Sequence, residues 1–257
     1  MKYKFILGFL IIAIFLSSCS ALFKERKITR NGVERNDFDL PIFVYPSSTP
    51  LSKRIIFLLS GDGGWIEFED SLSNKYAKNG FNVVGFNSRT YFWEQKTPKQ
   101  TAADLILRIN KYSVLYKANR IYLAGYSFGA DVIPFVYNLL PPDIKRKITA
   151  LQLLSPFAST DFDVHLITLA RDNRPYNVKA EMKNIKIPVF CFYGEMEDPK
   201  PLYDIKQKKI FLKTLPGDHH YETSSYQQII SSLKPGNRLI PAKKTIPPEL
   251  NAGNQKL

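Results

Sequence analysis

Short continuous apolar runs alternate with longer mixed segments along most of the chain. A continuous apolar run bounded by turn residues is typical of a strand that is buried on both faces of a parallel sheet. Such strands are predicted at residues 39–45, 54–60, 82–86, 120–124, 148–154, 187–193 and 210–215, and helices at 67–79, 99–116, from the turn at 125–129 to about 140, and at 224–233. Strands and helices that alternate in this way predict an α/β fold with a doubly wound, mostly parallel sheet.

The N-terminal segment differs from this pattern. Residues 1–18 combine two early lysines, an apolar run and small residues before Cys19, which predicts a secretory signal with a core too short for a comfortable membrane span. Leu16-Ser17-Ser18-Cys19 also resembles a bacterial lipobox, in which Cys19 is lipidated and begins the mature chain. A plain signal or a short anchor is the alternative. We therefore expect an exported lipoprotein of the cell envelope, periplasmic or associated with the outer membrane.

The composition fits one folded domain with a basic surface. At 257 residues and 44% hydrophobic content, the chain can bury the core of a single α/β domain. We assign 19–36 to a polar tether, 37–233 to this domain, and 234–257 to a tail that we expect to be disordered. The net charge of +13 suits an anionic partner such as a phospholipid surface, and a solvated lysine-rich surface is the simpler explanation. No nucleic-acid motif is present, which argues against DNA or RNA as a partner.

The glycine-rich segment 125–129 carries the first indication of chemistry. It reads Gly-Tyr-Ser-Phe-Gly at the junction of a predicted strand and a predicted helix, the pattern of a nucleophile elbow. In such a turn the serine hydroxyl stands above the sheet, and the flanking glycines let neighbouring backbones pass close by. We therefore predict that Ser127 is a catalytic nucleophile, with an ordinary glycine turn as the alternative.

A second glycine-rich turn, at 61–65, follows the predicted strand at 54–60. In α/β-hydrolases the turn at this place supplies one backbone N–H of the oxyanion hole, and the residue after the nucleophile supplies the other. The two donors would be Asp62 and Phe128. The turn lacks the spacing of a phosphate-binding or dinucleotide-binding loop, and a simple tight turn is the remaining alternative.

The sequence gives no reason to expect a metal ion or a cofactor. Cys19 and Cys191 are the only cysteines, and no CxxC or cysteine–histidine cluster is present. With Cys19 acylated, Cys191 has no disulfide partner, and we expect it to be a small buried core residue. We predict catalysis by side chains and backbone alone.

A serine nucleophile needs a base, and the chain contains three histidines. His165 precedes the acidic turn, whereas α/β-hydrolases place serine, acid and histidine in that order along the chain. His219 and His220 follow the last predicted strand, and only one of them can face Ser127, because adjacent residues of an extended loop point in roughly opposite directions. We assign the base to His219, which follows the turn at 216–218 as the base does in hydrolases that end in a glycine-x-histidine segment. The acid is expected in the turn at 194–199, where Glu197 stands three residues after the glycine and Asp198 is the alternative.

Several blocks of the chain, taken together, resemble a known family. They are SGDGGW at 60–65, Tyr91-Phe92-Trp93 followed by Thr97-Pro98, GYSFGAD at 125–131 with Pro134, Asp161-Phe162, YGEME at 193–197 and PGDHHY at 216–221. These blocks resemble the bacterial virulence proteins of the VirJ and AcvB type, within the α/β-hydrolases, and the chain looks like the single-domain form. The resemblance implies an exported serine hydrolase whose substrates are aminoacylated anionic phospholipids such as lysyl-phosphatidylglycerol.

The substrate cleft is expected to be open, because the insert at 156–184 is short and would form a minimal lid. We expect it to be lined by Arg89, Tyr91, Trp93 and Asp131. Asp131 would meet a cationic aminoacyl group, or else would be a structural hydrogen-bonding residue. A non-catalytic envelope scaffold and a general carboxylesterase are the rival functions, and the joint presence of serine, histidine pair and acid argues against the scaffold.

Overall fold

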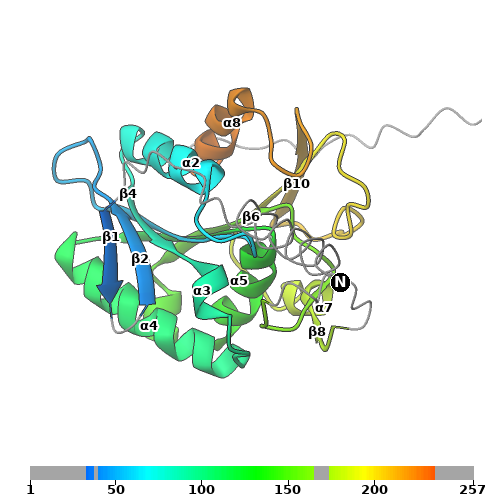
Figure 1. Ribbon diagram of the computed structural model, residues 1–257, viewed down its shortest axis with the longest axis horizontal. Coiled ribbons are helices and arrows are strands. Elements are labelled where there is room, and N and C mark those ends of the chain that lie inside the picture. Colours follow the sequence, from blue (N-terminus) through cyan, green and yellow to red (C-terminus); the bar gives the residue numbers. More distant parts are fainter. Residues whose placement is uncertain (1–32, 38–39, 165–173, 235–257) are drawn as a thin grey trace, which may run out of the picture. The chain divides into compact units, whose positions relative to one another are not determined.

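The computed structural model describes residues 33–37, 40–164 and 174–234 (Figure 1). The expected signal, the lipidation at Cys19, His165 and residues 235–257 of the expected tail lie outside the described residues. Among the helices of the described part, none has the length and apolar character needed to cross a membrane.

The centre of the domain is an eight-stranded sheet with the strand order β1-β2-β4-β3-β5-β6-β9-β10. Its strands are β1 (Val33–Asp37), β2 (Leu40–Tyr45), β3 (Arg54–Leu59), β4 (Asn82–Phe86), β5 (Arg120–Tyr126), β6 (Ile148–Leu154), β9 (Val189–Gly194) and β10 (Ile210–Leu215). The pairs β1–β2 and β2–β4 are antiparallel, and every other neighbouring pair is parallel. The predicted mostly parallel sheet is therefore confirmed.

Strand β1 is a correction to the predicted tether, which was assigned to 19–36. Val33 pairs with Val44 and Asp37 with Leu40, so the folded domain begins at least four residues earlier than the predicted boundary at 37. The segment reads Val-Glu-Arg-Asn-Asp and contains no apolar run. An edge strand of this composition gives no hydrophobic signal, because charged residues are common where a sheet edge meets solvent.

Helices cover both faces of the sheet (Figure 1). α2 (Glu67–Lys78) and α8 (Tyr226–Ser231) pack on one face, and α4 (Pro98–Leu115), α5 (Phe128–Leu139) and α7 (Val178–Met182) pack on the other. Successive side chains of β3 enter the two cores alternately: Ile56 and Leu58 face α2 and α8, whereas Ile55, Phe57 and Leu59 face α4 and α5. Burial on both faces explains why these strands read as continuous apolar runs.

The remaining elements are short. They are α3 (Ser88–Tyr91), α6 (Pro142–Lys145), the 3-10 turn η2 (Thr223–Ser225), and the antiparallel pair β7 (Ser159–Thr160) and β8 (Tyr176–Asn177). The pair β7–β8 and α7 belong to the predicted insert at 156–184, of which 165–173 lie outside the described residues, so the predicted minimal lid stays a prediction.

The parallel strands place the predicted chemistry at one edge. Strands β4, β3, β5, β6, β9 and β10 all end on the same side of the sheet, where ligands bind in open α/β folds. The turns after β3, β5, β9 and β10 carry Asp62, Ser127, Glu197 and His219. Residues far apart in the sequence are thereby brought to a common edge.

Candidate active site

Ser127 occupies a strained turn between β5 and α5. Its φ of 52° and ψ of −121° lie in a region that residues with a side chain rarely adopt. Its N–H donates to the carbonyl oxygen of Leu154 at 2.8 Å, which fixes the turn against β6. A Cβ at Gly125 would lie 2.3 Å from the carbonyl group of Gly129, and one at Gly129 would lie 2.4 Å from the carbonyl oxygen of Leu59. Both glycines are therefore required by close backbone packing.

A chain of hydrogen bonds connects the serine, a histidine and a carboxylate. Ser127 Oγ lies 2.9 Å from His219 Nε2, and His219 Nδ1 lies 3.0 Å from Glu197 Oε1. With the proton on Nδ1 donated to the carboxylate, Nε2 is free to accept the proton of the serine hydroxyl. This is the order of nucleophile, base and orienting acid that activates a serine.

The acidic turn after β9 resolves the choice between two carboxylates. Glu197 reaches His219, and its other oxygen, Oε2, accepts hydrogen bonds from the Gly194 N–H at 3.0 Å and the Ser155 hydroxyl at 2.8 Å. Asp198 is exposed to solvent. The arrangement favours Glu197 over Asp198 as the acid.

The two adjacent histidines face different surroundings. The ring of His219 lies 5.3 Å from the ring of Tyr126, and the Tyr126 hydroxyl donates to the His219 carbonyl oxygen at 3.1 Å. His220 is exposed, and its N–H donates to Asp218 Oδ1 at 2.8 Å. Of the two histidines, His219 is the one that is hydrogen-bonded to Ser127.

Two residues that sequence reasoning did not assign support Glu197. The Ser155 hydroxyl, which donates to Glu197, lies 2.7 Å from the Tyr221 hydroxyl, and the Tyr221 hydroxyl lies 3.0 Å from the Phe192 carbonyl oxygen. Tyr221 directly follows the histidine pair in the PGDHHY block, and this position could have indicated that it belongs to the site. Ser155 follows an apolar run and has no distinguishing pattern.

The two residues expected to be oxyanion donors belong to the turns after β3 and β5, which meet at Ser127. Phe128 is the first residue of α5, and the first N–H groups of a helix have no partner within the helix. Asp62 follows Gly61, where an added Cβ would lie 3.4 Å from Ser127 Cβ. The turn after β3 therefore runs directly beside Ser127, as the predicted assignment of Asp62 and Phe128 requires.

A buried carboxylate underlies the turn that carries Asp62. Glu69 is only 1% exposed, and its Oε1 and Oε2 accept hydrogen bonds from the N–H groups of Gly61 at 3.1 Å and Ile66 at 3.2 Å. Burial raises the pKa of Glu69 to about 7, and the nearby charge of Asp62 acts in the same direction.

Glu69 makes the stability depend on pH in a defined direction. Its pKa is about 7 in the folded chain against an ordinary value of 4.5, so the folded state binds the proton more tightly. The stabilisation from this group is complete below about pH 4.5 and is lost as pH rises through 7, by about 3 kcal/mol at most. Urea unfolding of wild type and Glu69→Gln at about pH 5 and about pH 8 should show wild type losing stability relative to the variant. A difference that does not change with pH would contradict this.

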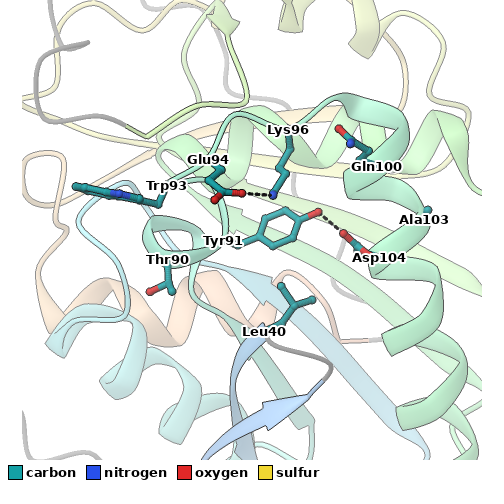
Figure 2. A pocket seen from close by; sticks show the side chains of 9 residues that line it. All are labelled: Leu40, Thr90, Tyr91, Trp93, Glu94, Lys96, Gln100, Ala103 and Asp104. Atoms are coloured by element: carbon teal, nitrogen blue, oxygen red, sulfur yellow. Dashed lines mark hydrogen bonds and ion pairs between the residues drawn. The ribbon is translucent and has the colours of Figure 1, made fainter.

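Two of the expected substrate-binding residues lie elsewhere. Tyr91 is buried, and its hydroxyl donates to Asp104 Oδ2 at 2.6 Å. Tyr91 and Trp93 line a separate cavity of about 640 Å³ between α3 and α4, to which Ser127, Glu197 and His219 do not contribute (Figure 2). Their assignment to the catalytic cleft is therefore not supported. The Phe92 ring contacts both Tyr91, which lines this cavity, and Phe128, which follows Ser127, with ring centroids 4.7 Å and 5.0 Å apart.

Of the other two residues expected to bind substrate, Arg89 lies near the candidate site and Asp131 is buried in the core. Arg89 is half-buried beside the turn after β3, since a Cβ on Gly64 would lie 3.3 Å from Arg89 Cβ. Asp131 is fully buried, and its Oδ1 accepts a hydrogen bond from the Phe157 N–H at 2.6 Å, which favours the structural alternative. Burial raises the pKa of Asp131 well above its ordinary value. What reaches the site instead is the ring of Phe157, 41% exposed and 5.8 Å from the ring of His219.

Solved structures with a similar fold include several esterases at low sequence identity. Est1E from Butyrivibrio proteoclasticus has a TM-score of 0.57 and 16% identity, over 78% of this chain and 95% of that chain. The esterase domain of a Rhodothermus marinus protein has a TM-score of 0.54 and 14% identity, over 76% and 92%. The Pyrococcus furiosus esterase Pf2001 has a TM-score of 0.53 and 17% identity, over 80% and 88%. The chain has the α/β-hydrolase fold.

A comparison of the sequence with models of protein families identifies the family of this chain. The family model described as "Bacterial virulence protein (VirJ)" matches residues 53–235, and the chain belongs to this family. The resemblance drawn from the separate sequence blocks is thereby confirmed. A comparison with curated proteins gives no match.

Proposed function

We propose that this protein is a serine ester hydrolase. The observation that carries the proposal is the hydrogen-bonded series from Ser127 through His219 to Glu197, on a strained turn at the carboxyl edge of a parallel sheet. Backbone strain at a residue that also contacts a histidine is typical of a functional site, because the surrounding structure must hold it there. A non-catalytic scaffold has no need for this combination.

The geometry supports a two-step acyl transfer. Ser127 Oγ attacks the ester carbonyl while His219 Nε2 takes the hydroxyl proton, and Glu197 stabilises the imidazolium that forms. The negative charge on the carbonyl oxygen is stabilised by the N–H groups of Asp62 and Phe128, and His219 then donates its proton to the leaving alcohol. Water, activated by His219 in the same way, hydrolyses the acyl-enzyme and restores the serine.

The charges around the nucleophile support a cationic substrate group. Asp62 and Asp218 are exposed near the site, and the pKa of the Tyr126 hydroxyl is raised by burial and then by the charges of Glu69, Glu197, Asp62 and Asp218. These acids gather at one site in a protein whose net charge is +13. Acidic side chains beside a cleft attract a cationic group, and they are opposed here by Arg89 beside the turn after β3 and by Arg174, whose guanidinium lies 6.0 Å from the Phe157 ring. Together with membership of the VirJ family, this supports aminoacylated anionic phospholipids such as lysyl-phosphatidylglycerol as the substrate class.

A pair of matched lipids tests the substrate class. The full chain is given lysyl-phosphatidylglycerol in mixed micelles, and in parallel the same lipid with both lysine amines acetylated, so that the ester is unchanged and the positive charges are removed. We expect release of lysine, absent in Ser127→Ala, and a kcat/KM at least about tenfold higher for the charged lipid, equivalent to about 1.4 kcal/mol. Equal kcat/KM values for the two lipids would favour a general carboxylesterase.

We further propose that the protein is exported and tethered to the membrane through lipidated Cys19. The support is the lipobox-like junction at 16–19 and the basic surface, since each Lys or Arg near an anionic leaflet contributes about 1 kcal/mol of attraction. A tether of this kind would keep the catalytic site close to lipid substrates.

Lipidation predicts a defined mature N-terminus. Mass spectrometry of membrane-extracted protein should find an acylated cysteine at position 19, and Cys19→Ser should leave the chain unprocessed or release it from the membrane, because the acyl chains provide the anchor. An unmodified Cys19 in the membrane-extracted wild type would reject the proposal. Replacing the buried Cys191 by serine, as a matched control, should leave the membrane fraction unchanged.

A further inference from the structure

Glu69 makes a contact that helix capping alone does not explain. It is the third residue of α2, and its Oε2 accepts the N–H of the N-cap residue Ile66 at 3.2 Å, as in a capping box. Its Oε1, however, reaches beyond the helix and accepts the N–H of Gly61 at 3.1 Å. One buried carboxylate therefore holds both ends of the segment 61–66.

This segment contains the proposed oxyanion donor. Asp62 lies between Gly61, which is hydrogen-bonded to Glu69, and Gly64, whose N–H donates to the Gly61 carbonyl oxygen at 3.1 Å. The Ser60 hydroxyl also donates to the Gly61 carbonyl oxygen, at 3.1 Å. Gly61, which directly precedes Asp62, is thus fixed through both its N–H and its carbonyl group. It also lies beside Ser127, because a Cβ added to Gly61 would be 3.4 Å from Ser127 Cβ.

We propose that Glu69 is a positioning residue of the active site, whose carboxylate holds the 61–66 turn so that the Asp62 N–H points at the developing oxyanion. This inference rests on the proposed serine hydrolase function. Donors of an oxyanion hole lower the barrier only if they are oriented before the charge develops, so a loosened turn weakens binding of the transition state more than binding of the ester.

A carboxylate at position 69 can accept both hydrogen bonds, whereas an amide cannot. Two N–H donors converge on Glu69, and a carboxylate offers an acceptor oxygen to each. A glutamine at this position has one acceptor oxygen, and its NH2 group would face the second N–H. Glu69→Gln therefore removes one of the two fixed points while it keeps the size of the side chain.

The test uses the full chain and a small soluble ester, for which lipid access plays no part. It is run at about pH 8.5, above the Glu69 pKa of about 7, so that Glu69 is a carboxylate. Glu69→Gln should lower kcat by about 10- to 100-fold and leave KM within about twofold, which is less than the roughly 10²- to 10³-fold loss expected when an oxyanion donor is removed. The rate at which a fluorophosphonate labels Ser127 should fall by the same factor, because its phosphoryl oxygen occupies the same hole.

Tyr76→Phe is the matched control on the same helix. Tyr76 lies about two helical turns after Glu69, and its buried hydroxyl is hydrogen-bonded to Gln152, so its loss should lower the melting temperature without changing kcat. If Glu69→Gln does not fold, Glu69→Asp keeps the charge, shortens the side chain by one methylene and should show the same selective loss of kcat.

The outcomes separate this inference from the proposed function. A wild-type protein that hydrolyses esters, with a folded Glu69 variant whose kcat is within about threefold of it, would overturn the positioning role and leave the function intact. A Glu69 variant with raised KM and unchanged kcat would also overturn it. A wild-type protein that neither hydrolyses esters nor reacts with the phosphonate would reject the proposed function itself.

Discussion

Ser127→Ala should lower kcat for ester hydrolysis by about four to six orders of magnitude while the protein stays folded. The hydroxyl forms the covalent intermediate, so its removal leaves only the binding site and the oxyanion donors to act on the substrate. The Oγ hydrogen bond to His219 is lost, but the N–H of residue 127 can still donate to the Leu154 carbonyl oxygen and keep the turn in place. The measurement is kcat on one soluble ester, with folding checked by circular dichroism.

Ser127→Gly gives this experiment an internal control. Glycine adopts the φ of 52° without the strain that a side chain brings. Ser127→Gly should therefore be as inactive as Ser127→Ala, and its free energy of unfolding should be higher than that of Ser127→Ala by about 1 kcal/mol. Loss of activity and gain of stability in one variant would separate the chemistry from the fold. Turnover at the wild-type rate in either variant would end the proposal that Ser127 is the nucleophile.

His219→Ala should be nearly as damaging as Ser127→Ala. His219 Nε2 lies 2.9 Å from Ser127 Oγ, so the variant loses both the base that activates the serine and the acid that protonates the leaving group. Because the two residues act as a unit, the double variant should be little worse than either single one. The measurement is kcat for the three variants on the same ester.

His220→Ala is the matched control one position away. His220 is exposed and bonded to Asp218, so its removal should change kcat by no more than a few-fold. An inactive His220→Ala together with an active His219→Ala would reverse the assignment of the base. Such a result would require the loop to rearrange before substrate binds.

The sequence predicted most of the sheet because its central strands are buried on both faces. The run at 54–60 agrees with β3 to within one residue, since its side chains enter both cores and all must be apolar. Strand β1 was missed because it is an edge strand with a charged sequence, and its pairing with β2 is a tertiary contact that no local pattern encodes.

The candidate site was predicted where local geometry dictates the residue type. Glycines at 125 and 129 reveal the elbow because any side chain there would collide with backbone. The choice between Glu197 and Asp198 needed the structure, because neighbouring residues in a turn point in different directions. Ser155 and Glu69 could not be found from sequence, since their roles arise only from contacts with Glu197 and Gly61 across the fold.

The substrate-binding residues were the least predictable part. Tyr91 and Trp93 lie in one of the blocks that identify the family, but nearness in sequence does not say which cavity a side chain lines. Asp131 lies one helical turn after Ser127, and its burial depends on the loop after β6, whose Phe157 N–H it accepts. Long-range packing decided both cases.

Labelling with a fluorophosphonate probe tests most directly whether Ser127 is a nucleophile that is activated by His219. Mass spectrometry of the full chain should locate the probe on Ser127, with no label at that position in Ser127→Ala, a rate at least about 100-fold lower in His219→Ala and an unchanged rate in His220→Ala. Wild-type protein that hydrolyses an ester while the probe modifies a different residue, or labels at the same rate in His219→Ala, would contradict it.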